Sequence, residues 1–126
     1  MHVSHLDAAD AFVTLDGSTI RELAGRVSLP AEHQSLAEAT VPVGGATAEH
    51  YHVRSEELYF FTAGSGRMTL GDEERAVTAG DCVVIPPGQV HELVNTGEGP
   101  LVLLCCCAPA YSHEDTVLVE DQASDG

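Results

Sequence analysis

The chain has 126 residues, a length that suits one compact domain, and 44% of them are apolar. Its formal net charge is −15 at pH 7 and all five basic residues are scattered arginines, so we expect no nucleic-acid or anionic membrane partner. No apolar run could span a bilayer, and the start of the chain lacks the cationic and apolar regions of a secretory signal, which favours a cytoplasmic protein.

The N-terminal third carries few strand signals. The stretches "SHLDAADAFV" and "TIRELAG", residues 4–13 and 19–25, are the only ones that could form short helices. We therefore expect residues 1–33 to form a short helical or irregular arm.

The rest of the chain consists of short runs rich in β-branched and aromatic residues, separated by regularly placed glycines and prolines. This pattern predicts an all-β sandwich or barrel. Gly71 and Asp72 mark the clearest hairpin tip, and the acidic tail 120–126 should be frayed. The expected strands are 35–41, 57–63, 66–70, 75–79, 82–86, 91–95 and 101–107.

Two histidines and a glutamate lie close together where strand signals are strong. Residues two apart on a strand point to the same face, so His50 and His52 project side by side and can hold one metal ion. Glu57 follows after a segment long enough for a tight turn and can face the same interior. Such a His-x-His pair alone is weak evidence, because paired histidines also occur as surface or ordinary core residues.

A third histidine is held by rigid local geometry. In "GDCVVIPPGQVHELVN", residues 80–95, Pro86 and Pro87 fix the backbone and Gly88 permits the turn. His91 therefore begins the following strand in a defined direction.

These residues resemble the two sequence motifs of the cupin superfamily. The first motif runs from Gly44 through His50, His52 and Glu57 to Gly64. The second runs through the positions Gly80, Pro86, Gly88, His91 and Asn95. The resemblance covers about residues 34–108, and flanking phrases are similar to small bacterial cupins of the mannose-6-phosphate isomerase-like type.

The resemblance implies a double-stranded β-helix, a jelly-roll barrel, as the single domain 1–126, with a barrel core at about 34–108 and a C-terminal tail at 109–126. It also implies that His50, His52, Glu57 and His91 are metal ligands in the barrel mouth. Three imidazoles and a carboxylate suit one divalent transition ion, such as Mn, Fe, Zn, Ni, Co or Cu, without choosing among them. Small cupins commonly pair through sheet edges, so a homodimer is expected.

Two kinds of function fit these features. A metal-dependent enzyme would act on a small oxygenated molecule by Lewis-acid activation, as an isomerase, lyase, cyclase or dioxygenase, with Glu57 tuning the ion. The alternative is a non-catalytic module that binds a small molecule or a sugar. A third possibility is a metal that only stabilises the barrel, or a degenerate site that binds no metal.

Several other residues have weaker claims to a role in the site. Tyr59 and Phe61 share the parity of Glu57, so Tyr59 is either a proton donor or pocket wall, whereas Phe61 is expected to fill the core. The direction of Arg67 is undecided, and His33 and His113 are expected at the surface or in loops. Cys105, Cys106 and Cys107 are expected to be buried, reduced thiols acting as small apolar residues.

Overall fold

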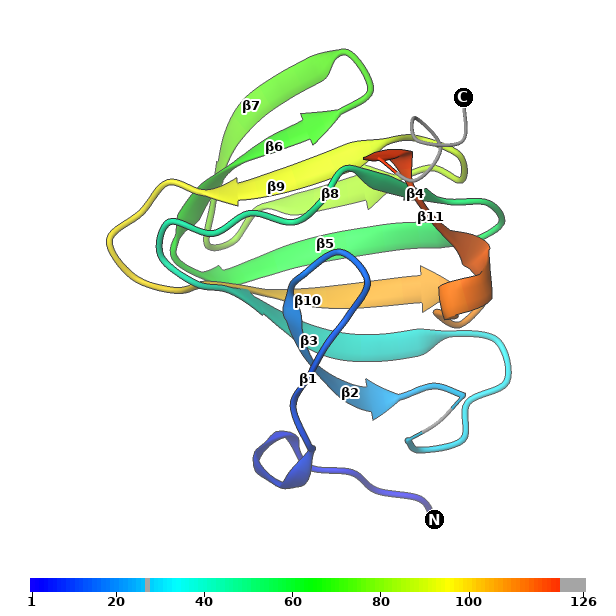
Figure 1. Cartoon of the computed structure of the whole chain (residues 1–126). Coiled ribbons are helices and arrows are strands. Elements are labelled where there is room, and N and C mark those ends of the chain that lie inside the picture. Colours follow the sequence, from blue (N-terminus) through cyan, green and yellow to red (C-terminus); the bar gives the residue numbers. More distant parts are fainter. Residues whose placement is uncertain (27, 121–126) are drawn as a thin grey trace.

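The computed structural model of the chain describes residues 1–26 and 28–120. Within these residues the strands form a six-stranded sheet in the order β1-β2-β3-β10-β5-β8 and a five-stranded sheet in the order β11-β4-β9-β6-β7 (Figure 1). All the pairings between named strands are antiparallel. The strands are β1 Phe12–Val13, β2 Thr19–Ala24, β3 Ser35–Val41, β4 His50–His52, β5 Glu56–Ala63, β6 Ser65–Leu70, β7 Glu73–Thr78, β8 Cys82–Ile85, β9 His91–Asn95, β10 Leu101–Ala108 and β11 Thr116–Leu118.

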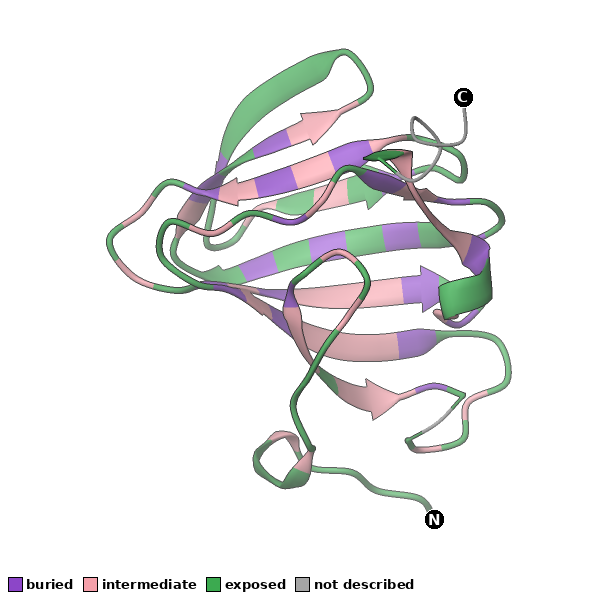
Figure 2. Cartoon of the chain, in the orientation of Figure 1, coloured by how far each residue is buried: buried purple, intermediate pink, exposed green. Residues whose placement is uncertain are grey.

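The core lies between the two sheets, and both contribute to it. Buried and exposed residues alternate along β5, because successive side chains on a strand point to opposite faces (Figure 2). Phe61 is completely buried, as the sequence predicts. The core cluster contains Ala39, Val41, Tyr59, Phe61, Ile85, Leu101 and Leu103 from one sheet and Met68, Val77 and Leu93 from the other.

The expected strands of the barrel are confirmed, two of them, 35–41 and 91–95, with the expected bounds and the others within two residues at each end. The β6–β7 hairpin turns at Gly71 and Asp72, and Leu70 pairs with Glu73 across it. Gly71 has a φ of +58°, which suits the first position of a two-residue hairpin turn and disfavours any larger residue there. Of the acidic tail 120–126, residues 121–126 lie outside the described residues.

Of the two short helices considered for the N-terminal arm, the one at 19–25 is wrong and the one at 4–13 is reduced to three residues. Residues 19–24 form strand β2, in which Ile20 pairs with Ala39 and packs against the core. Of the other stretch, only Leu6–Ala8 is helical, as the short 3₁₀ helix η1. Segments this short are not stable as helices in isolation, so pairing with an available sheet edge decides their structure. The arm is thus partly built into the larger sheet.

The three consecutive cysteines do not share one environment. Cys107 is buried and points inward, whereas Cys105 and Cys106 are half-buried and point to opposite faces of β10. The expectation that all three thiols are buried is therefore wrong. All four cysteines are unpaired, and burial raises the pKa of the Cys105 and Cys107 thiols, which makes them poor nucleophiles.

In the described part of the chain, no helix has both the length and the apolar character needed to cross a membrane.

Candidate metal centre

Three histidines from two strands meet in the interior of the barrel. His50 and His52 lie on β4 and His91 on β9, and His50 pairs with His91 across the two strands. One nitrogen from each ring can be chosen so that all three lie within 4.8 Å of one another. All three side chains are buried. The structure therefore brings together the three histidines that the sequence motifs single out.

The remaining contacts of the rings fix which nitrogen faces the centre. The Nδ1 atom of His50 lies 2.7 Å from the carbonyl oxygen of Ala48, and that of His91 lies 3.0 Å from the carbonyl oxygen of Gln89. A carbonyl oxygen can only accept, so both Nδ1 atoms carry the proton. Each Nε2 of a neutral ring then has a free lone pair directed away from these carbonyls.

His52 is oriented in the same way by a threonine on β11. Thr116 on β11 donates its hydroxyl hydrogen to the carbonyl oxygen of Ser112, at 2.9 Å. Its oxygen lies 3.0 Å from Nδ1 of His52 and so accepts from that nitrogen. Thr116 is a supporting residue that the sequence motifs give no reason to expect.

Glu57 completes the group from β5 on the opposite sheet. Its Oε1 atom lies 3.1 Å from Nε2 of His52 and 3.5 Å from Nε2 of His91. Burial alone would raise the pKa of Glu57, but hydrogen bonds and positive charge from His52 and His91, when these rings also carry a proton on Nε2, outweigh it and lower the pKa to about 2. A bound cation would favour the ionised carboxylate in the same way. Burial, reinforced by the neighbouring His91, lowers the pKa of His50, which favours a neutral ring. Neutral imidazoles and an ionised carboxylate are the protonation states in which these groups bind metals.

One atom of this group is left without a hydrogen bond. Nε2 of His91 is fully buried and has no hydrogen-bond partner in the described part of the chain, although Glu57 lies 3.5 Å away. A buried nitrogen without a partner costs about 1–3 kcal/mol. A cation among the three Nε2 atoms and Oε1 would satisfy all of these lone pairs at once. The donor set therefore fits a metal ion.

A small cavity of about 30 Å³ adjoins these residues. Tyr59 lines it, as the sequence analysis allowed, with its ring edge-on to His91, and burial raises its pKa well above the ordinary value. Cys105 and Tyr111 also contribute to the wall. A volume of this size holds a few water molecules or one small chemical group.

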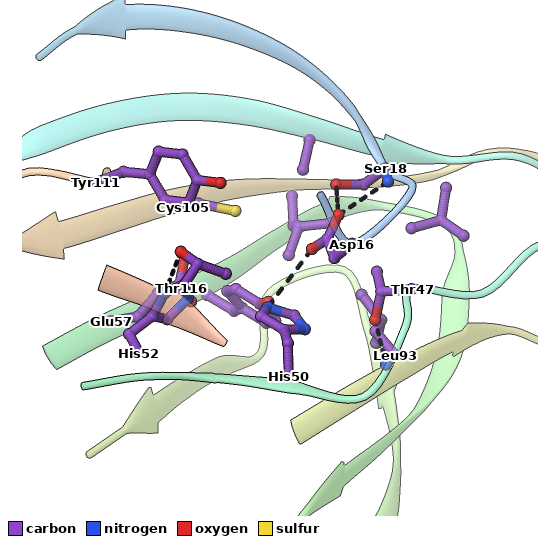
Figure 3. A pocket seen from close by; sticks show the side chains of 14 residues that line it. Asp16, Ser18, Thr47, His50, His52, Glu57, Leu93, Cys105, Tyr111 and Thr116 are labelled. Carbon is purple, nitrogen blue, oxygen red and sulfur yellow. Dashed lines mark hydrogen bonds and ion pairs between the residues drawn. The ribbon is translucent and has the colours of Figure 1, made fainter. Parts of the chain in front are cut away.

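One acidic residue of the cavity is not predicted by the sequence motifs. Asp16 reaches it from the loop between β1 and β2, and its Oδ2 atom lies 3.6 Å from Nε2 of His50 (Figure 3). The only signal in the sequence is an Asp-Gly pair between two β-branched runs, which indicates a turn and nothing about where it lies.

The other residues considered from sequence lie away from the centre. Arg67 is exposed and pairs with Glu74 on the neighbouring strand. His33 is exposed. His113 lies in the 3₁₀ helix η2, His113–Asp115, and its ring forms a hydrogen bond with the hydroxyl of Tyr111. Both histidines are therefore surface or loop residues, as expected.

Comparison with known proteins identifies the family of this chain. The profile of the Cupin domain family matches residues 37–107, more than half of the chain. The chain belongs to the cupin family. An uncharacterized protein, MJ1618 of Methanocaldococcus jannaschii, is 47% identical over 114 residues, which cover 90% of this cupin and 91% of that protein.

Two solved structures show the same fold. A formate complex of Lactobacillus farciminis oxalate decarboxylase superposes with a TM-score of 0.81 and 22% identity, over 97% of this chain and 37% of the other. The polyketide cyclase RemF of Streptomyces resistomycificus gives a TM-score of 0.79 and 22% identity, over 94% of this chain and 85% of the other. At this identity the likeness establishes the shared double-stranded β-helix.

Proposed function

We propose that this cupin binds one divalent transition-metal ion through His50, His52, His91 and Glu57 and uses it as an enzyme on a small oxygenated molecule. The observation that carries the proposal is the unpartnered, buried Nε2 of His91, which faces a carboxylate and two further imidazoles. Without a cation or an additional proton, lone pairs would face one another in the interior, which is unfavourable.

The chain's own residues prepare the centre in three ways. The carbonyls of Ala48 and Gln89 and the hydroxyl of Thr116 hold the rings so that Nε2 faces inward. The donors come from strands of both sheets, with Glu57 on β5 facing the histidines of β4 and β9. The buried walls limit the water around a bound molecule, which strengthens electrostatic interactions there.

When bound, the ion would supply Lewis acidity that stabilises negative charge developing on a substrate oxygen. Four protein donors leave room for other ligands on a six-coordinate ion, which favours chemistry over a purely structural role. Isomerase, lyase, cyclase and dioxygenase reactions all use such a centre. The fold neighbours include a decarboxylase and a cyclase, which supports a catalytic use of this kind of barrel.

Metal analysis of variants tests the ligand assignment. We expect close to one divalent ion per chain after purification, and loss of most of it in His52→Ala and His91→Ala, because each variant removes a donor from a site with four. His33→Ala is the matched control, since this histidine is exposed and does not belong to the group, and it should retain the ion. Full occupancy in either ligand variant would show that the assignment is wrong.

Activity assays then separate the classes of reaction. Oxygen consumption over a panel of diketones, uronates and hydroxyketones identifies a dioxygenase, and product formation without oxygen uptake identifies redox-neutral chemistry. A metal-loaded protein that binds small molecules but converts none of a wide panel would favour a binding module.

A further inference from the structure

Asp16 is held rigidly by its own loop, which spans residues 14–18. Its Oδ1 atom accepts three hydrogen bonds: from the Ser18 amide at 2.9 Å, from the Ser18 hydroxyl at 2.6 Å and from the Thr14 hydroxyl at 2.7 Å. Gly17 has a φ of +92°, a conformation that only glycine adopts without strain, and it lets the loop close around the carboxylate. One oxygen of Asp16 is thus fully engaged.

The other oxygen of Asp16 is directed at the proposed metal centre. Oδ2 lies 3.6 Å from Nε2 of His50, and the side chain of Asp16 is largely buried. The backbone oxygen of Asp16 accepts from the amide of Ala48 at 2.7 Å, and Ala48 also orients His50. The loop is therefore fastened to the segment that leads into β4, and Figure 3 shows the carboxylate between Ser18 and His50.

No positive side chain balances the two carboxylates of this cavity. Within the described residues that line it, Asp16 and Glu57 are the charged groups, and the lining contains no arginine. The chain has no lysine, and its five arginines, at 21, 26, 54, 67 and 75, are all exposed. A divalent ion with Glu57 alone would leave one net positive charge, which attracts anions, whereas Asp16 cancels that charge.

We propose that Asp16 makes the site selective for uncharged molecules with a hydroxyl next to a carbonyl, and that it disfavours carboxylates and phosphates. This inference rests on the proposed metal centre. A neutral ligand can bring two oxygen donors to the ion while its hydroxyl donates to Oδ2 of Asp16. An anion meets a carboxylate where a cationic side chain would be needed to bind it. The cavity of about 30 Å³ requires the ligand to enter with a small end group.

Two ligands of nearly equal shape isolate the effect of charge. Hydroxyacetone and glycolate share a hydroxyl next to a carbonyl, and they differ in a methyl group against a carboxylate oxygen. Each is titrated into Co²⁺-loaded protein, and binding is followed by the visible absorption of the ion. The measured quantity is the ratio of the glycolate affinity to the hydroxyacetone affinity, because a general weakening of the site cancels from it.

We expect Asp16→Asn to raise this ratio by about tenfold or more, since it removes one negative charge from the cavity but keeps the size of the side chain. Asp10→Asn makes the same charge change on the exposed N-terminal segment and should leave the ratio unchanged. Ser18→Ala removes one of the three hydrogen bonds to Oδ1 but keeps the charge, so its ratio should rise far less than that of Asp16→Asn, and it shows how much loop distortion alone contributes.

The outcomes distinguish this inference from the proposed function. Protein that takes up no Co²⁺ overturns both. Protein that binds Co²⁺ but shows the same ratio in the parent and in Asp16→Asn overturns the role of Asp16 and leaves the metal centre standing. An equal rise in Ser18→Ala also overturns the charge argument, because that variant retains both carboxylates.

Discussion

Glu57 uses its two carboxylate oxygens differently. Oε1 faces His52 and His91, while Oε2 accepts a hydrogen bond from the thiol of Cys107 at 3.3 Å. Burial and the adjacent carboxylate both raise the pKa of that thiol, so it stays protonated and acts as a donor. The thiol of Cys107 on β10 therefore holds one carboxylate oxygen, and the other oxygen faces the imidazoles.

Replacing Glu57 by Gln should weaken metal binding without abolishing it. The variant keeps one oxygen donor and three imidazoles but removes the negative charge, so we expect affinity to fall by about tenfold or more. Competition with a chelator of known affinity measures this. Turnover of an eventual substrate should fall on the order of a hundredfold, because the charge on the ion changes.

Tyr59→Phe is the companion variant for this experiment, since it deletes one hydroxyl from the cavity wall and none of the donors. It should retain parental metal affinity. If Glu57→Gln also binds metal as tightly as the parent, Glu57 is not a ligand.

The site residues that could be predicted from the sequence are those with local spacing. His50, His52, Glu57 and His91 all fall in two short motifs with fixed turns. Asp16 and Thr116 could not be found in this way, because each reaches the site through pairing between segments that are distant in the chain. Their side chains are common in turns and strands, so residue type alone indicates nothing about the site.

The strand β11 and the 3₁₀ helix before it, η2, tie the C-terminal region to the turn between β4 and β5. Asp115 is buried, and its carboxylate accepts from the backbone amides of Arg54 and Ser55 at 2.9 and 3.0 Å. Burial opposes ionisation, but these hydrogen bonds outweigh it and lower the pKa of Asp115 below its ordinary value. The same anchor places Thr116 beside His52.

Asp115→Asn should lower the free energy of unfolding at pH 7 by about 1–3 kcal/mol, because one buried amide loses its charged acceptor. A folded-state pKa below the unfolded value, about 3.9, means that this contribution is present above about pH 4. It is lost as the pH falls through the folded-state pKa. The difference between parent and variant should therefore shrink below about pH 4.

Urea unfolding of metal-free protein between pH 7 and pH 3 measures that difference. Asp10→Asn, on the exposed N-terminal segment, controls for the general effect of removing one acidic group. A difference between parent and Asp115→Asn that stays constant across this range would contradict the assigned role of the carboxylate.

Elements were predictable where both periodicity and turn residues were clear. The strands from β3 to β10 that carry β-branched runs between glycines and prolines are confirmed. β2 was not predictable, because "TIRELAG" has helix-forming residues and no alternation, and its partner strand β3 decides its conformation. The short strand β4 is stabilised by pairing with β11 on one side and with β9 on the other.

The outer face of the larger sheet carries an uncharged area on this otherwise acidic cupin. Leu58, Phe60 and Val84 are exposed there on neighbouring strands, and Leu58 pairs with Val84. The neighbouring β8 is an edge strand in the sheet order of the described residues. Two chains with a net charge of −15 each repel, so an uncharged face beside an open edge is the most favourable place for them to meet.

The homodimer stays a prediction, and this face is where we expect it. The parent should sediment as a dimer at micromolar concentration, and Phe60→Asp should shift it to monomer by placing a charge in the apolar contact. Ala76→Asp introduces the same charge on an exposed strand of the other sheet and should remain dimeric. A monomeric parent, or a dimer unaffected by Phe60→Asp, would contradict this interface.

Asp16 lies in a loop outside the segment that matches the family, whereas the four proposed metal donors lie on barrel strands inside it. The two parts can therefore diverge at different rates among related proteins. A single substitution at position 16 would change the charge of the cavity and leave the barrel and its donors intact. Relatives that share all four donors should be grouped by the residue at this loop position before they are assumed to accept the same substrates.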